Sequence, residues 1–173
     1  STLGNNTGVR NVFLGSYAGC DISSGNDNVT MGTCAGQKIT TASDNILIGN
    51  EAGKCYSGGC NIFFGKYAGK GSSSVGSNTG IFNIVLGVSA GCDLTVGSRN
   101  VFIGNQSGKA NTTGCDNTFI NVAGEANTIG RANAFIGRKS GHHNTEGCYN
   151  VFFGQGSGYE NTTGCNNVFI GCY

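Results

Sequence analysis

The sequence lacks the features that identify several large classes of protein. It has no basic run and a formal net charge of +1, so nothing predicts nucleic-acid binding. No apolar stretch approaches about 18 residues, so we expect no membrane insertion. The nine cysteines form no paired CxxC motif, and the two histidines, His142 and His143, are adjacent rather than spaced as ligands. We therefore expect no metal and no cofactor.

Clustered carboxylates are also missing. Catalysis needs titratable groups that converge on one site, and the nine acidic residues are scattered along the chain. The Gly-Gly-x-Gly-x-Asp nonapeptide of calcium-binding rolls is absent as well. The sequence therefore predicts a protein that is not an enzyme and has no catalytic residues.

What the chain does contain is a repeat. An Asn followed by two or three apolar residues and usually Gly begins at ten places, and the steps between these asparagines are 17, 17, 16, 22, 17, 17, 16, 17 and 17 residues. A fixed period means one structural unit stacked on copies of itself. The ten asparagines are Asn11, Asn28, Asn45, Asn61, Asn83, Asn100, Asn117, Asn133, Asn150 and Asn167.

The period and composition predict an all-β fold, a β-solenoid of about ten turns. Helical solenoids need around 30 or more residues per unit and disfavour this much glycine, of which the chain has 32. About 17 residues suit one turn made of a short strand and glycine-marked corners. We expect one repeat array over residues 1–173, with a longer loop at 70–82 and disulfide reinforcement.

Numbering each repeat from its Asn as position zero separates two apolar rows, because neighbouring side chains of a strand point to opposite faces. Positions one and three carry mostly Val, Ile and Leu, and position two carries mostly Phe. Since a thin solenoid has one interior, we expect the Val/Ile rows inside and the Phe row outside, covered by another chain rather than by the loop. This predicted assembly face comprises Phe13, Phe63, Phe102, Phe119, Phe135, Phe152 and Phe169.

Three other rows have structural interpretations. Stacked asparagine amides at position zero can hydrogen-bond up and down a ladder. Position twelve repeats Ser or Thr, as in Thr95 and Thr112. Glycines at positions four, eight and fourteen mark corners where a positive φ is expected.

Several Asn-x-Ser/Thr triplets predict N-glycosylation. Asn111 and Asn161 lie at variable corner positions and are the best candidates, followed by Asn105 and Asn5. Asn28 belongs to the ladder and is a poor acceptor.

The cysteines predict disulfides in an oxidising compartment, although a row of buried free thiols remains an alternative. Cys148 and Cys165 share a repeat position in adjacent turns, where stacked Cα atoms lie about 5 Å apart. Two further candidate pairs are Cys55 with Cys60 and Cys20 with Cys34.

The phase of the two ends predicts a longer object. The ten residues before Asn11 and the seven from Asn167 onward together make 17, one turn, and neither end carries a capping pattern. We expect either head-to-tail stacking of subunits or a segment of a longer array.

The phrase Asn-Val-Phe-Ile-Gly-x-x-Ala-Gly, followed by Asn-Thr-Thr-Gly, resembles Asn/Gly-rich β-solenoid (β-roll) repeat proteins of extracellular fibres. Its strand is similar to the Ser-Val-Ala-Ile-Gly units of trimeric adhesin heads, and it looks like repeats of viral tail fibres and of microbial or algal glycofibril proteins. This resemblance implies a cell-surface or secreted fibre.

Together these patterns favour a structural subunit of an extracellular, glycosylated filament that assembles with copies of itself, as a homopolymer or as a trimer within a fibre. The alternative is the shaft of an adhesin or tail fibre that binds a receptor or glycans through residues 71–82 or the His142–His143 corner. A minor alternative is ice binding, for which only one Ser/Thr rank is regular.

Overall fold

A computed structural model describes residues 7–74 and 76–172 of the chain. Its regular structure consists of ten strands of three residues each. They are β1 (Val12–Leu14), β2 (Val29–Met31), β3 (Ile46–Ile48), β4 (Ile62–Phe64), β5 (Ile84–Leu86), β6 (Val101–Ile103), β7 (Thr118–Ile120), β8 (Ala134–Ile136), β9 (Val151–Phe153) and β10 (Val168–Ile170).

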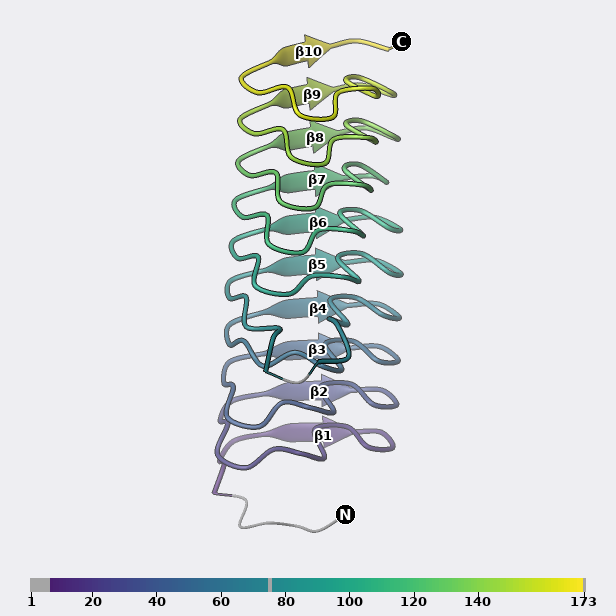
Figure 1. The fold of residues 1–173 in the computed structure, drawn as a ribbon. Coiled ribbons are helices and arrows are strands. Elements are labelled where there is room, and N and C mark those ends of the chain that lie inside the picture. Colours follow the sequence, from purple (N-terminus) through teal and green to yellow (C-terminus); the bar gives the residue numbers. More distant parts are fainter. Residues whose placement is uncertain (1–6, 75, 173) are drawn as a thin grey trace.

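The strands form one parallel sheet in sequence order, from β1 to β10 (Figure 1). Each residue pairs with the residue at the same repeat position in the next strand, as Val12 does with Val29 and Leu14 with Met31. The chain returns to the start of each strand through corners that are stacked in the same way (Figure 1). The predicted all-β solenoid is therefore confirmed, with nine steps between its ten strands.

Unusual backbone conformations form the corners of every turn. The residue directly before each ladder asparagine has a left-handed backbone, with φ between 54° and 62° in all ten turns, although none of these residues is glycine. At position four, Gly32 has φ 128°, and a Cβ there would lie 2.6 Å from the carbonyl oxygen of Gly49 in the next turn. The strand must therefore end at this position, and a larger residue would push the turns apart.

The phenylalanine row lies in the interior, so the prediction that it forms an outward assembly face was wrong. Phe102 has an exposed fraction of 0%, whereas Ile103 beside it is 37% exposed. The ladder asparagine points inward at position zero, and strand alternation then places position two inward and positions one and three outward. Those assigned to the assembly face and now found buried are Phe63, Phe102, Phe119, Phe135 and Phe152; Phe13 is partly buried and Phe169, in the last strand, is 43% exposed.

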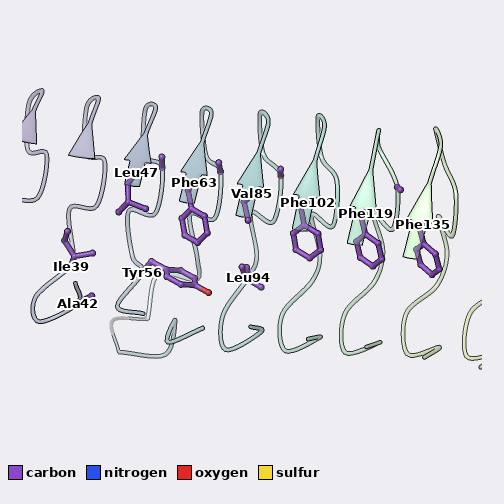
Figure 2. Close-up of a cluster of buried hydrophobic side chains, with 14 of the residues drawn as sticks. Ile39, Ala42, Leu47, Tyr56, Phe63, Val85, Leu94, Phe102, Phe119 and Phe135 are labelled. Atoms are coloured by element: carbon purple, nitrogen blue, oxygen red, sulfur yellow. The ribbon is translucent and has the colours of Figure 1, made fainter. Parts of the chain in front are cut away.

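Stacked aromatic rings fill the interior of the later turns. Figure 2 shows the rings of Phe63, Phe102, Phe119 and Phe135 on the same side of their strands. Ring centroids lie 4.6–5.2 Å apart and ring planes are within 11° of parallel from Phe102 through Phe169. The spacing of stacked turns, about 4.8 Å, imposes this face-to-face arrangement on identical residues.

The asparagine ladder follows the predicted pattern. The backbone N–H and side-chain Nδ2 of Asn28 both donate to Oδ1 of Asn11, at 3.0 and 3.1 Å, and the same pair of bonds joins Asn45 to Asn28. The second Nδ2 hydrogen of Asn28 is donated to the carbonyl of Ala42, at 2.9 Å. The amide thus satisfies the corner carbonyls within a buried environment.

The Ser/Thr row and the corner glycines are also structural, for two different reasons. Thr95 Oγ1 donates to the carbonyl of Thr112 in the next turn, at 2.9 Å. Glycines at position fourteen do not have the positive φ expected for them. They are required by close approach, because a Cβ on Gly114 would lie 2.4 Å from the carbonyl oxygen of Gly130.

The longer loop is fastened by one buried side chain. Asn78 donates from Nδ2 to the carbonyls of Cys55, at 2.8 Å, and Ser72, at 2.9 Å, and its Oδ1 accepts from the backbone N–H of Ser72. The insertion therefore leaves the stack of strands uninterrupted, and β4 pairs with β5 in the same register as the other strands.

Candidate interaction surface

The outward face of the sheet is the most distinctive surface of the molecule. We call the side chains at positions one and three of the ten strands the outer sheet face. Nineteen of these twenty side chains are apolar, none is charged, and Thr118 is the one polar member. They are Val12, Leu14, Val29, Met31, Ile46, Ile48, Ile62, Phe64, Ile84, Leu86, Val101, Ile103, Thr118, Ile120, Ala134, Ile136, Val151, Phe153, Val168 and Ile170.

Much of this face is open to solvent. Leu14 is 61% exposed, Phe64 56% and Phe153 54%, while smaller members in the middle of the sheet are partly covered by their neighbours. Contiguous apolar patches of this extent are uncommon on monomeric soluble proteins and are typical of interaction surfaces. The strands that carry these side chains are stacked one on the next from β1 to β10 (Figure 1).

Ion pairs follow part of one edge of the outer sheet face, just before the strands begin. Asp116 accepts two hydrogen bonds from Arg99, at 2.6 and 3.0 Å, and Asp27 accepts two from Arg10 in the same way. The hydrogen bonds and the positive charge of Arg99 lower the pKa of Asp116. These exposed pairs lie beside the strip, not within it, and they bound the apolar surface at those turns.

A second asparagine ladder, which the repeat pattern did not predict, lies inside the later turns. Asn127 Nδ2 donates to Asn111 Oδ1 at 2.7 Å, Asn144 to Asn127 at 2.8 Å, and Asn161 to Asn144 at 2.7 Å. Earlier turns place Ile39, Tyr56 or Leu94 at the corresponding interior position. The recurrence of Asn in four successive turns was the available signal.

This ladder overturns the two leading glycosylation candidates. Asn111 is fully buried, and the Nδ2 groups of both Asn111 and Asn161 donate hydrogen bonds inside the stack, so neither is presented for modification in the folded protein. Asn105 is exposed at a corner, with a single long hydrogen bond of 3.5 Å to the carbonyl of Val88. Asn5 lies outside the described residues.

All nine cysteines are free thiols, so none of the three predicted disulfides is formed in the structure. Cys148 and Cys165 do lie in adjacent turns, where the backbone N–H of Cys148 donates to Cys165 Sγ at 3.1 Å. Cys55 is buried and Cys60 exposed, and Cys20 Sγ contacts the carbonyl of Gln37 rather than Cys34.

The thiols have a hydrogen-bonding role that spacing alone did not reveal. Cys148 Sγ accepts from the backbone N–H of Arg131 at 3.4 Å and donates to the carbonyl of Glu146 at 3.2 Å. Ser98 makes the same two contacts with its hydroxyl group, to Ile81 and Val96. Cysteine therefore substitutes for serine in this column.

The histidines lie in a cluster of rings at one corner. The His142 ring stacks on Tyr159 with centroids 5.0 Å apart, and His143 Nδ1 lies 3.1 Å from Glu160 Oε2. Partial burial lowers the pKa of His142, which favours its neutral form. Across residues 7–74 and 76–172, no three His, Cys, Asp or Glu side chains form a group that could hold a metal ion.

Comparison of the chain with protein-family models, with curated proteins and with solved structures finds no match. The described part of the chain also contains no helix with the length and apolar character needed to cross a membrane.

Proposed function

We propose that the protein is a non-catalytic structural subunit of an extracellular filament, in which copies associate side by side through the outer sheet face. The observation that supports this is the composition of that face, nineteen apolar side chains and no charge over ten stacked strands. This replaces the phenylalanine row, which fills the interior, as the assembly surface.

The size of the face fits an interface between two proteins. Specific interfaces take roughly 20–30 residues from each partner, and the outer sheet face supplies twenty. Fully burying one large apolar side chain is favourable by about 1.5–3 kcal/mol relative to full exposure. The side chains here are already half covered, so each would contribute a fraction of that value, summed over the length of the rod.

Stacking along the rod axis supports the same proposal. Every turn joins the next through identical strand pairing and through the Asn ladder, as Asn150 joins Asn133 with bonds of 3.0 and 3.2 Å. The same contacts can join a further turn, whether it belongs to this chain or to another copy. End-to-end stacking would add length to the filament, and side-by-side packing would add thickness.

The proposed extracellular location and the proposed cross-links are each supported by particular residues. An extracellular location is supported by the sequon at Asn105, which is the one described candidate that is exposed and weakly bonded. Oxidation of Cys148 and Cys165 would cross-link adjacent turns. Partners other than copies of the chain are limited to glycans in this proposal.

Charge introduced on the outer sheet face tests it. Wild-type protein is expected to self-associate in sedimentation velocity and to form filaments in electron microscopy, whereas Ile84→Lys with Ile103→Lys is expected to stay monomeric. The matched control is Val96→Lys with Ile129→Lys, at apolar side chains that are equally or more exposed but lie at a corner. A wild-type protein that is monomeric at every concentration contradicts the proposal, as does equal loss of assembly in both variants. A single tight ligand on a glycan array would favour the adhesin alternative.

A further inference from the structure

The outer sheet face is made of two columns that differ in size. Position one carries the smaller side chains, including Ala134 and Thr118, and position three carries the larger ones, including Phe64 and Phe153. In eight strands the side chain at position one is smaller than the one at position three, and in β3 and β5 the two are isomeric or identical. The face is therefore a low column beside a high column in all strands except β3 and β5.

Two copies can cover this face in two symmetric ways. If the two-fold rotation axis is parallel to the rods, the two rods are parallel. Each strand then meets the same strand of the other copy, and position one of one copy lies against position three of the other. With the axis parallel to the strands, the rods are antiparallel, β1 meets β10, and position one lies against position one. The fit between the small and the large side chains differs between these two arrangements.

Parallel rods place the smaller side chain of each pair against the larger one in eight of the ten strands, and place side chains of equal size together in β3 and β5. Ala134 then faces Ile136 of the next copy, Val151 faces Phe153, and Ile62 faces Phe64. In antiparallel rods with full overlap, Phe153 faces Met31 while Val151 faces Val29, so large pairs hold the sheets apart along one side. Protein interiors are close-packed, and gaps beside the small pairs would forfeit contact energy.

Two exposed apolar residues beside β5 favour the same arrangement. Phe82 precedes the strand and is 56% exposed, and Val88 follows it and is 47% exposed. Parallel rods bring Phe82 of one copy to Val88 of the next, which widens the apolar contact at that level. Antiparallel rods place β5 opposite β6, so that Phe82 meets Arg99 and Val88 meets Asn105.

We infer that the outer sheet face is covered by a second copy of this chain with rods parallel and turns level, position one of each copy against position three of the next. This inference rests on the proposed function, because it specifies the geometry of the same self-association. A three-fold axis parallel to the rod obeys the same rule at each of its three seams. The assembly is consequently polar, with all copies pointing the same way.

Mixtures of oppositely charged variants test the orientation. Ile46→Lys with Ile48→Lys puts positive charge on β3, and Ile46→Glu with Ile48→Glu puts negative charge on the same strand. In parallel rods these charges face one another. In antiparallel rods β3 faces β8, so they lie about 24 Å apart, beyond the Debye length of about 8 Å at physiological salt. The second mixture pairs the lysine variant with Ala134→Glu and Ile136→Glu on β8.

Each variant alone is expected to remain monomeric in sedimentation velocity. The mixture charged on β3 in both chains is expected to recover assembly, with an apparent dissociation constant at least about tenfold below that of the β3/β8 mixture. Recovery in the β3/β8 mixture instead would overturn the parallel arrangement and leave self-association intact. Recovery in neither mixture, when wild-type protein assembles, would also overturn it. Wild-type protein that never assembles would contradict the proposed function itself, which separates the two failures.

Discussion

Phe102 and Ile103 are consecutive residues of β6, yet the ring of Phe102 is fully buried and the side chain of Ile103 is 37% exposed. The pair defines the two sides of the sheet. Phe102 stacks on Phe119 inside the solenoid, with ring centroids 5.2 Å apart, and Ile103 belongs to the outer sheet face. Substitutions at these neighbours therefore separate folding from assembly.

We expect Phe102→Ala to destabilise the folded chain by about 3–5 kcal/mol, because it removes a buried ring and leaves a cavity. Ile103→Ala should lower the free energy of unfolding of the dilute monomer by about 1 kcal/mol, because the side chain is only partly covered, while weakening self-association. Urea unfolding and sedimentation velocity measure the two effects. A large loss of monomer stability in Ile103→Ala would contradict the assignment of faces.

The asparagine ladder should be sensitive to a single deletion. Asn133 donates from Nδ2 to Asn117 Oδ1 and to the carbonyl of Gly147, and its Oδ1 accepts two bonds from Asn150. We expect Asn133→Ala to destabilise by about 1–3 kcal/mol for each buried group left without a partner. Asn105→Ala, at an exposed corner, is the control and should be close to neutral in urea unfolding.

The cysteine column should tolerate serine. Cys148→Ser keeps an acceptor for the N–H of Arg131 and a donor for the carbonyl of Glu146, as Ser98 does in its own turn. We expect Cys148→Ser to unfold within about 0.5 kcal/mol of wild type and Cys148→Ala to lose about 0.5–1.5 kcal/mol. If reduction lowers the unfolding midpoint of the wild type alone, a Cys148–Cys165 disulfide is present in the purified protein.

The left-handed corners predict a stabilising substitution. Ala132 has φ 54°, a conformation that is unfavourable for residues with a Cβ by about 1–2 kcal/mol. Ala132→Gly should relieve this strain and, after the greater flexibility of unfolded glycine is subtracted, raise the stability. Ala126, which is not among the residues with positive φ, provides the matched control, and Ala126→Gly should lower the stability. Thermal unfolding of both variants distinguishes the signs.

The Arg99–Asp116 pair should contribute a small, pH-dependent stabilisation. Hydrogen bonds and charge from Arg99 lower the pKa of Asp116. A carboxyl group with a lowered pKa stabilises the fold above its unfolded value of about 4, and the contribution is lost as the pH falls through the folded value. Arg99→Met should therefore reduce stability at pH 7 and converge with wild type near pH 3. Arg138→Met removes the same charge elsewhere and should show no such convergence.

Much of the architecture followed from the order of residues. The period of 17, the asparagine ladder and the corner glycines are local and repeated, so each turn supplies independent evidence for the same unit. The strand bounds, three residues after each ladder asparagine, follow from the glycine that ends each strand in most turns. These features could be predicted from the repeat alone, because each residue is stacked on the residue at the same repeat position in the next turn.

The choice of interior was decided by the tertiary structure. Alternation along a strand assigns residues to two faces, but it does not say which face the returning chain encloses. The left-handed residue before each asparagine turns the chain so that the asparagine and phenylalanine side chains point inward. These corner residues are chemically diverse, as Arg10 and Phe82 illustrate, so no single residue type marks the position in the sequence.

The outcome for the glycosylation candidates also depended on which side of each turn is enclosed. Asn111 and Asn161 match an acceptor pattern in one dimension, and only the closed turn shows that their amides are used inside a ladder. The sequence by itself determined a solenoid whose strands carry two apolar rows. Only one of these rows can fill the single interior. The tertiary structure decided that phenylalanine is the enclosed row and Val/Ile the exposed one, because the corners fix the direction in which each turn closes.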